Sequence, residues 1–127
     1  MRILKLFLLF LILINCNQKN EIDEEFHDFD KRFHSDSIFQ MSRITFPLKG
    51  NIVDGFEKKN WSEKEWEILR TSVTEKTVEK DFKKQTIFSD SLVTEKIWIE
   101  NSGFIFERHF KKIDGKWYLV FCEDNNL

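Results

Sequence analysis

The 127-residue chain has only two cysteines, one proline and four glycines. Two cysteines allow at most one disulfide bond, so the chain is not a small scaffold held together by several disulfides. The glycines are isolated from one another, which excludes a glycine-rich phosphate-binding loop. The three histidines, His27, His34 and His109, lack the thiol partners and the spacing of a zinc site. We therefore predict no cofactor and no bound metal.

Positive charge is not in excess either, because 20 basic residues stand against 22 acidic ones and the formal net charge is −2. A protein that binds nucleic acid neutralises phosphates with a basic surface, so nucleic acid is not an expected partner. The chain also lacks an apolar run of about 20 residues, the length that crosses a bilayer as a helix. The uninterrupted apolar run near the N-terminus covers only residues 6–14.

This N-terminal segment resembles a bacterial lipoprotein signal peptide. Positive charges precede the apolar run, and Leu13-Ile14-Asn15-Cys16 matches a lipobox at its apolar positions and at the cysteine. Asn15 departs from the small residue that usually precedes the cut. We expect residues 1–15 to be removed and Cys16 to carry lipid such as palmitate, because several acyl chains anchor a protein durably. An ordinary secreted protein and an uncleaved N-terminal anchor are the alternatives.

Residues 16–21 are polar and are expected to form a tether between the lipid and a single domain over residues 22–127. Removal of Arg2 and Lys5 leaves 18 basic residues against 22 acidic ones, a formal charge of −4. The membrane is therefore reached through lipid rather than charge. The tether resembles the lysine-plus-acid tracts of Bacteroidota lipoproteins, with a plain solvated linker as the alternative. We predict a lipid-anchored cell-envelope protein at the outer membrane, facing the periplasm or the cell surface.

Aromatic residues at helical spacing predict an amphipathic helix over about residues 21–34, with acidic residues in its first turn. The apolar stripe consists of Ile22, Phe26, Phe29 and Phe33. Ser35 or Asp36 can cap a second, shorter helix that ends near Arg43. Pro47 then favours an extended chain, and residues 51–59 are expected to form a loop.

A further helix is predicted over residues 63–70. Ser62 and Glu65 have the spacing of a capping box, and Trp61 and Trp66 have the spacing of a hydrophobic staple. Residues 71–82 carry no decisive pattern.

The C-terminal part has the alternating pattern and the turn residues of β-strands. The expected strands cover residues 84–88, 93–100, 104–112 and 116–123. Asn101-Ser102-Gly103 and Asp114-Gly115 are typical hairpin turns. Helices followed by an antiparallel meander predict an α+β fold, with the helices on one face of a curved sheet.

Several of these segments resemble one family of envelope proteins from Bacteroides-like bacteria. Residues 39–48 (Phe-Gln-Met-Ser-Arg-Ile-Thr-Phe-Pro-Leu), residues 104–108 and residues 114–119 are similar to motifs of the domain of unknown function 4348 family. The resemblance covers residues 22–123. It implies a nuclear transport factor 2-like (cystatin-like) cone, in which N-terminal helices pack on a strongly bent antiparallel sheet. It implies no activity, so function must be inferred from a site.

Four residues are candidate ligand-binding groups. Alternation places Arg108 on an apolar strand face, where a guanidinium needs a partner; the partner is either a ligand or an internal acid. Gln40 and Arg43 lie three apart on one helix face, and Trp98 could line a cavity or shield the sheet. Alternation also places Phe121 on the same strand face as Trp117 and Leu119, opposite Cys122.

We interpret the chain as a non-catalytic binding module whose ligand is a small molecule in the cone or an envelope protein on the sheet face. Cys122 is expected to be a buried, inert thiol. An assembly subunit that dimerises through its sheet is the alternative. A small pocket enzyme is the least favoured interpretation, because no inward-facing acid and histidine pair suited to general base catalysis is evident, and no catalytic residue is assigned.

Overall fold

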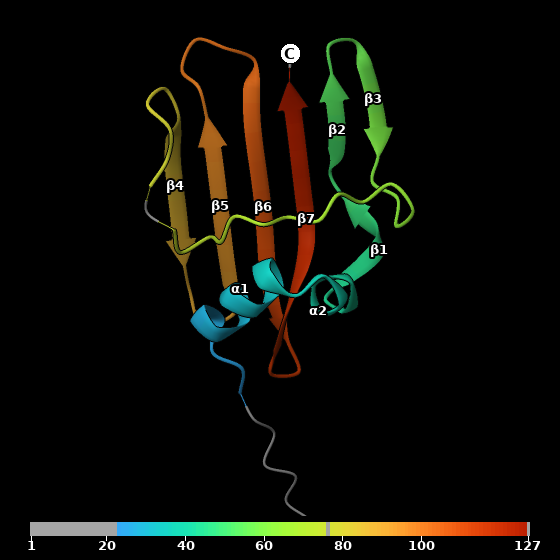
Figure 1. The fold of residues 1–127 in the computed structure, drawn as a ribbon, viewed down its shortest axis with the longest axis vertical. Coiled ribbons are helices and arrows are strands. Elements are labelled where there is room, and N and C mark those ends of the chain that lie inside the picture. The colour runs from blue at the N-terminus through green and yellow to red at the C-terminus, as the bar shows by residue number, and fades with distance from the viewer. Residues whose placement is uncertain (1–22, 76, 127) are drawn as a thin grey trace, which may run out of the picture.

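The computed structural model describes residues 23–75 and 77–126, in which two short helices precede seven strands (Figure 1). In chain order the elements are α1 (Phe26–Ser35), α2 (Ser37–Ser42), β1 (Ile44–Lys49), β2 (Asn51–Asp54), β3 (Glu57–Asn60), β4 (Lys83–Phe88), β5 (Leu92–Trp98), β6 (Phe104–Ile113) and β7 (Lys116–Asn126). No helix in these described ranges is long and apolar enough to span a membrane.

The strands form one open sheet in the order β3-β2-β7-β6-β5-β4, with β1 paired to β7 beside this path. The helices lie against one face of the sheet, near one end of the long central strands (Figure 1). The predicted α+β class is therefore confirmed. The sheet is mixed rather than purely antiparallel, because β1 and β2 pair with β7 in parallel.

The first helix begins later than predicted, so the acidic residues 23–25 precede it and Asp28 is the acidic residue of its first turn. The Glu25 carboxylate accepts hydrogen bonds from the amides of His27 and Asp28 at 2.9 and 3.0 Å, so Glu25 is the N-cap. These two hydrogen bonds lower the pKa of the Glu25 carboxyl. Asp36 caps α2 in the same way through the amide of Phe39, as one of the two sequence alternatives predicted.

The core is built mainly from aromatic rings of α1 that meet the long hairpin β6–β7. Phe29, Phe33 and Phe110 are at most 1% exposed, and both helix rings contact Phe110 edge to face at 5.7 and 5.4 Å between ring centroids. Leu119 and Trp117 of β7 are buried beside them. The predicted aromatic stripe of α1 is thus the core face of the helix.

The β6–β7 hairpin turns at Asp114-Gly115 as predicted, with φ of 49° and 78° at these two residues. One β-bulge changes the faces further along the hairpin. Phe110 pairs with Leu119 whereas the preceding His109 pairs with Phe121, so β7 contains one extra residue at this point. The prediction that Phe121 shares a face with Leu119 is therefore wrong, since one extra residue reverses every later side chain.

The loop predicted over residues 51–59 is instead the hairpin β2–β3. The pairing of Asp54 with Glu57 leaves only Gly55 and Phe56 in the turn. Charged residues dominate β3, and such a strand carries no alternation that would reveal it in the sequence.

The helix predicted over residues 63–70 is also absent, although its local signals form. The amide of Glu65 donates to the Ser62 hydroxyl at 3.2 Å, and the rings of Trp61 and Trp66 lie 5.0 Å apart. The described chain nevertheless continues as turns and irregular backbone up to Glu75. A short isolated helix is marginal in water, so tertiary contacts decide its fate. We call residues 61–75 the strap, because they cross the helix-covered face of the sheet (Figure 1).

Gly50 allows β1 and β2 to approach β7 closely. It has φ of +95°, and a Cβ atom at this position would overlap the backbone carbonyl of Cys122. We expect Gly50→Ala to reduce the free energy of unfolding by about 3 kcal/mol or more, since neither the backbone angle nor the space admits a methyl group.

Gly55→Ala is the matched control, because Gly55 also has positive φ (+59°) but nothing lies within 4 Å of its added Cβ. It should cost only about 1 kcal/mol, the strain of the left-handed conformation. Urea unfolding of both variants measures the difference, and equal losses would contradict the assigned overlap.

Candidate functional site

A buried polar network lies beneath the strap, with Arg108 of β6 at its centre. Arg108 is 2% exposed and donates from Nε to Glu95 Oε1 at 2.6 Å and from NH2 to the carbonyl of Thr71 at 2.8 Å. Its NH1 lies 2.7 Å from Nε2 of His34. The guanidinium therefore joins β5, α1 and the strap. The sequence left two possible partners for Arg108, a ligand or an internal acid, and in the structure the partner is an internal acid, Glu95.

His34 is held in one tautomer by its two neighbours. Because a guanidinium only donates, Nε2 of His34 must accept from Arg108. The proton is therefore on Nδ1, which lies 2.7 Å from the carbonyl of Asp30 and 3.1 Å from its carboxylate. The ring is thus neutral, since a second ring proton would point at the guanidinium.

Asp30 is fully buried on α1 and binds the strap. Its carboxylate accepts the amides of Val73 and Thr74 at 2.9 and 3.0 Å and the Thr74 hydroxyl at 2.8 Å. Burial raises the pKa of Asp30, but the hydrogen bonds from His34, Val73 and Thr74 outweigh it and hold the pKa well below its usual range. Asp30 is therefore a permanent anion at neutral pH.

Lys84 of β4 closes the other end of the network. Its Nζ lies 3.0 Å from Oε2 of Glu95 and donates to the carbonyls of Val73 and Glu75 at 2.9 and 2.7 Å. Glu95, which is 1% exposed, is thereby placed between two cations, Arg108 and Lys84. Its charge is compensated without solvent.

Gln40 of α2 makes four hydrogen bonds within the protein. Its Nε2 donates to the carbonyls of Phe33 and Leu69 at 2.8 and 2.7 Å, and its Oε1 accepts from Trp66 Nε1 and the Leu69 amide at 3.0 and 2.9 Å. Two donors and two acceptor sites are the full capacity of an amide side chain. Gln40 thus holds the strap to the helices.

The four predicted ligand-binding residues do not form one site. Arg108 and Gln40 are buried within the network and beneath the strap. Trp98, at the end of β5, lines a hollow of about 280 Å³ near the β5–β6 loop. Arg43 lines a larger pocket at the opposite end of the long strands. A ligand role for these residues stays a prediction.

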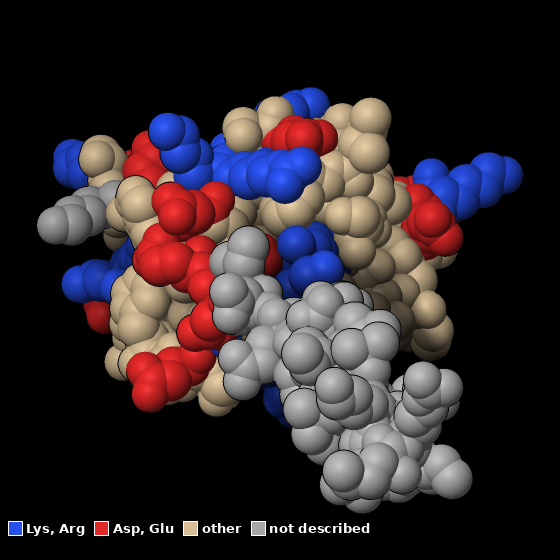
Figure 2. Space-filling view, turned by 90° about the horizontal axis from the view of Figure 1, so that it is seen from below, with Lys and Arg blue, Asp and Glu red and all other residues tan. Residues whose placement is uncertain are grey.

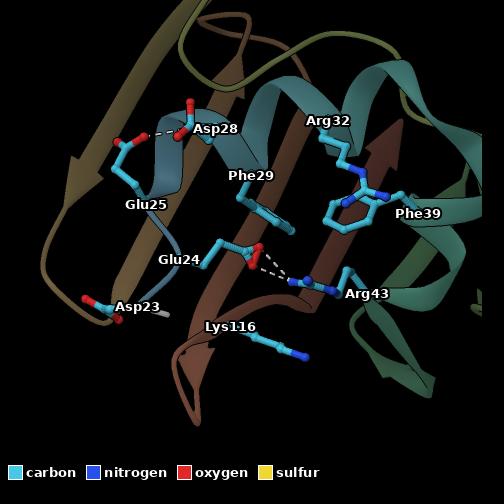
Figure 3. A pocket seen from close by; sticks show the side chains of 9 residues that line it. All are labelled: Asp23, Glu24, Glu25, Asp28, Phe29, Arg32, Phe39, Arg43 and Lys116. Atoms are coloured by element: carbon cyan, nitrogen blue, oxygen red, sulfur yellow. Dashed lines mark hydrogen bonds and ion pairs between the residues drawn. The ribbon is translucent and has the colours of Figure 1, made fainter. Parts of the chain in front are cut away.

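The tether pocket, with a volume of about 520 Å³, lies beside the first described residues of the chain. It is lined by Asp23, Glu24, Glu25, Asp28, Phe29, Arg32, Phe39, Arg43 and Lys116. Most of the acidic side chains lie along one side and the three basic ones along the other, with a Glu24–Arg43 pair between them (Figure 3). Viewed from below, acidic side chains also gather on one side of this end of the molecule, with basic ones across from them (Figure 2).

Arg43 is the best-positioned group in the tether pocket. Its NH1 donates to both carboxylate oxygens of Glu24 at 2.8 and 2.6 Å and to the carbonyl of Trp117 at 3.0 Å. The Phe39 ring lies 4.5 Å from the guanidinium carbon of Arg43 and 4.1 Å from that of Arg32. Cation–π contacts thus hold both guanidinium groups against one aromatic ring.

Cys122 and His109 lie outside the tether pocket. Cys122 is fully buried as expected, and burial raises the pKa of its thiol to about 12, so it stays protonated and inert. His109 lies on the uncovered sheet face, stacked on Phe121 and 2.8 Å from Glu107. In the described part of the chain, no cluster of three histidine, cysteine or acidic side chains is arranged to hold a metal ion.

Sequence reasoning missed several members of the network. Glu95 was detectable, because it alternates with Val93 and Ile97 and therefore points to the core face. Asp30 and His34 lie one residue beyond Phe29 and Phe33 of the aromatic stripe, and their burial depends on the strap that covers them. No local signal marks that position.

Comparisons with known proteins agree with this architecture. A protein-family model described only as "-like" matches residues 24–126, and the chain belongs to that family. No functionally curated protein matches the chain. A crystal structure of a cystatin-like protein from Bacteroides caccae is 27% identical, with a TM-score of 0.64, over 80% of this chain and 76% of that one.

Two further solved structures share the fold. A protein from Bacteroides uniformis is 24% identical with a TM-score of 0.57, over 82% of this chain and 77% of that one. An NTF2-like protein from Bacteroides fragilis is 21% identical with a TM-score of 0.56 and is covered over 48% of its length by 83% of this chain. The predicted cystatin-like or NTF2-like fold is therefore confirmed, and none of these descriptions names an activity.

Replacement of Arg108 by leucine tests the buried network. Arg108→Leu leaves Glu95 buried with only Lys84 and frees the carbonyl of Thr71, so we expect a loss of about 3–5 kcal/mol in the free energy of unfolding. Lys111→Leu, an exposed change on the same strand, should stay within about 0.5 kcal/mol. Chemical denaturation measures both, and a loss below about 1 kcal/mol for Arg108→Leu would contradict a structural role.

Proposed function

We propose that this protein is a lipid-anchored, non-catalytic binding module of the cell envelope and a member of the domain of unknown function 4348 family. The lipobox at Leu13–Cys16 supports the anchor, and the motif at residues 39–48 supports the finer family assignment. Both lie in the same chain as a cystatin-like domain whose Bacteroides relatives share its architecture.

The tether pocket is the proposed binding site, and its three converging cations are the observation that carries the proposal. Arg32 and Lys116 are exposed and Arg43 is half-buried, and the three come from α1, the start of β7 and the end of α2. Among the described residues, Nε and NH2 of Arg43 have no hydrogen-bond partner. A guanidinium with open donors suits a carboxylate or a phosphate, so the ligand carries an anionic group.

The buried titratable groups support binding rather than catalysis. Asp30 and His34 are engaged with each other, with Arg108 and with the strap, and they do not line the tether pocket. A general base must reach a proton of its substrate, which these groups do not. Catalysis by Asp30 or His34 would require the strap to move away.

Assembly through the sheet is the second candidate function. Among the strands of the described structure, β4 pairs only with β5 and therefore forms one edge of the sheet. Ile87 and Phe88 at its end are 58% and 56% exposed, and the adjacent Leu92 is 41% exposed. An apolar, unpaired strand edge favours association with another chain.

Acylation of Cys16 tests the anchor directly. Metabolic labelling with a fatty-acid probe should mark the wild-type protein and leave Cys16→Ala unmarked, since the lipid is attached through the sulfur atom of Cys16. Cys122→Ala is the control and should remain labelled. Equal labelling of wild type and Cys16→Ala, or no labelling of either, would contradict the lipoprotein assignment.

Anion binding tests the pocket independently of the anchor. We expect inorganic phosphate or acetate to shift the amide NMR signals of residues around Arg43, because the three cations attract either anion. The double variant Arg32→Gln/Lys116→Gln should weaken this binding by about tenfold or more, a loss of about 1.4 kcal/mol. Lys58→Gln, an exposed change on β3, is the control; an equal loss in the control would mean diffuse electrostatics.

A further inference from the structure

The tether pocket lies beside the first described residues, which follow the proposed membrane anchor in sequence. Asp23, Glu24 and Glu25 line the pocket and follow the tether directly in sequence. Cys16 is seven Cα–Cα steps from Asp23 of the pocket, a separation of at most about 25 Å when the chain is fully extended. An acylated Cys16 therefore holds the pocket within that distance of the bilayer surface.

We propose that the tether pocket holds the headgroup of a zwitterionic phospholipid, one with a phosphate and a primary amine, from the membrane in which Cys16 is anchored. This inference rests on the proposed function and names the ligand class of the same site. The protein thus contacts the membrane twice, through its own acyl chains on Cys16 and through the headgroup of a neighbouring phospholipid.

The basic side of the pocket matches the phosphate. Arg43 is kept in place by Glu24, by the carbonyl of Trp117 and by the Phe39 ring, so its open donors are preorganised. Arg32 is kept against the same ring. Lys116 lies on the same side of the pocket, near Arg43 (Figure 3). Two guanidinium groups and one ammonium offer charge-assisted hydrogen bonds to the two non-bridging oxygens of a phosphodiester.

The acidic side of the pocket matches the amine. Asp28 is exposed and has no ion-pair partner among the described residues. Glu24 and Asp23 are partly neutralised by Arg43 and by Lys112, and Glu25 caps α1. A primary ammonium has N–H donors for the Asp28 carboxylate, whereas the quaternary ammonium of a choline headgroup has none. Ethanolamine is therefore favoured over choline.

Charge balance favours a zwitterionic lipid over an anionic one. Four acidic and three basic side chains line the pocket, and the chain from Cys16 onward has a formal charge of −4, because residues 1–15 contain two of the 20 basic residues and none of the 22 acidic ones. An anionic bilayer would repel such a domain at close range. A zwitterionic headgroup supplies the phosphate without that net repulsion.

Vesicle binding by the unacylated chain tests the proposal. The chain from residue 16 onward with Cys16→Ser keeps every described helix and strand. We expect it to bind vesicles of phosphatidylcholine mixed with phosphatidylethanolamine about tenfold more tightly than vesicles of phosphatidylcholine alone. Asp28→Asn should remove this preference, and Arg32→Gln/Lys116→Gln should weaken binding to both. Lys58→Gln, far from the pocket, should change neither.

Three results would overturn the inference, and they differ in what they leave standing. Tighter binding to vesicles containing phosphatidylglycerol would mean that the pocket recognises negative charge alone. Binding of free O-phosphoethanolamine without binding to phosphatidylethanolamine vesicles would mean a soluble ligand. Both outcomes leave the proposed anion-binding function intact. Failure of inorganic phosphate, acetate, O-phosphoethanolamine and every vesicle to bind would remove the proposed function as well.

Discussion

The strap depends on buried polar side chains for its backbone hydrogen bonds. Residues 61–75 cross the sheet without helix or strand structure, and backbone groups that are removed from water need partners. Gln40 bonds both backbone groups of Leu69, Asp30 bonds two successive amides, and Arg108 and Lys84 bond carbonyls. These polar side chains thus allow an irregular segment to close the core. Phe29, Phe33 and Phe110 are fully buried in that core.

This use of polar groups determines where a ligand can be bound. The centre of the helix-covered sheet face is occupied by Arg108, Glu95 and their neighbours, which are paired with one another. A sizeable hollow with uncommitted charge lies instead at the margin, beside α1, the end of α2 and the start of β7. A protein with this fold can therefore have its binding site at the margin of the sheet, outside the core, without a change in topology.

Much of the fold followed from local patterns. The aromatic stripe of α1, the Asp36 cap, the Asp114-Gly115 turn and the strands of the meander are each specified by residues close in sequence. The parallel pairing of β1 and β2 with β7 is non-local and had no such signal. The capping box at Ser62 shows the opposite case, because its hydrogen bond forms and the helix does not. In the predicted helix over residues 63–70, the hydrogen bonds of the Leu69 backbone with Gln40 are made in place of helical ones, so tertiary contacts outweigh local helix propensity.

The candidate site was predicted only in part. Arg108 was correctly found to need a partner, and of the two alternatives that partner is an internal acid, Glu95, directly opposite Arg108 on the neighbouring strand β5. Arg43 was identified through a resemblance, and its neighbours Arg32 and Lys116 come from distant segments that only the folded chain brings together. No spacing rule within one element could have joined them.

Because much of the strap is held through its backbone, those of its side chains that point to solvent are only lightly constrained. Trp66 and Val73 are buried, and Trp61, Ile68 and Leu69 pack against the core. Glu63, Lys64, Glu67 and Arg70, in contrast, are exposed and belong to no regular secondary structure. Sequence drift should therefore be fast at these exposed positions and slow both at the buried strap residues and at the residues of other elements that bind the strap. In homologous chains, most of the segment that covers the core would look like a variable loop, and its importance would be recorded in a few buried strap residues and in the residues that bind them.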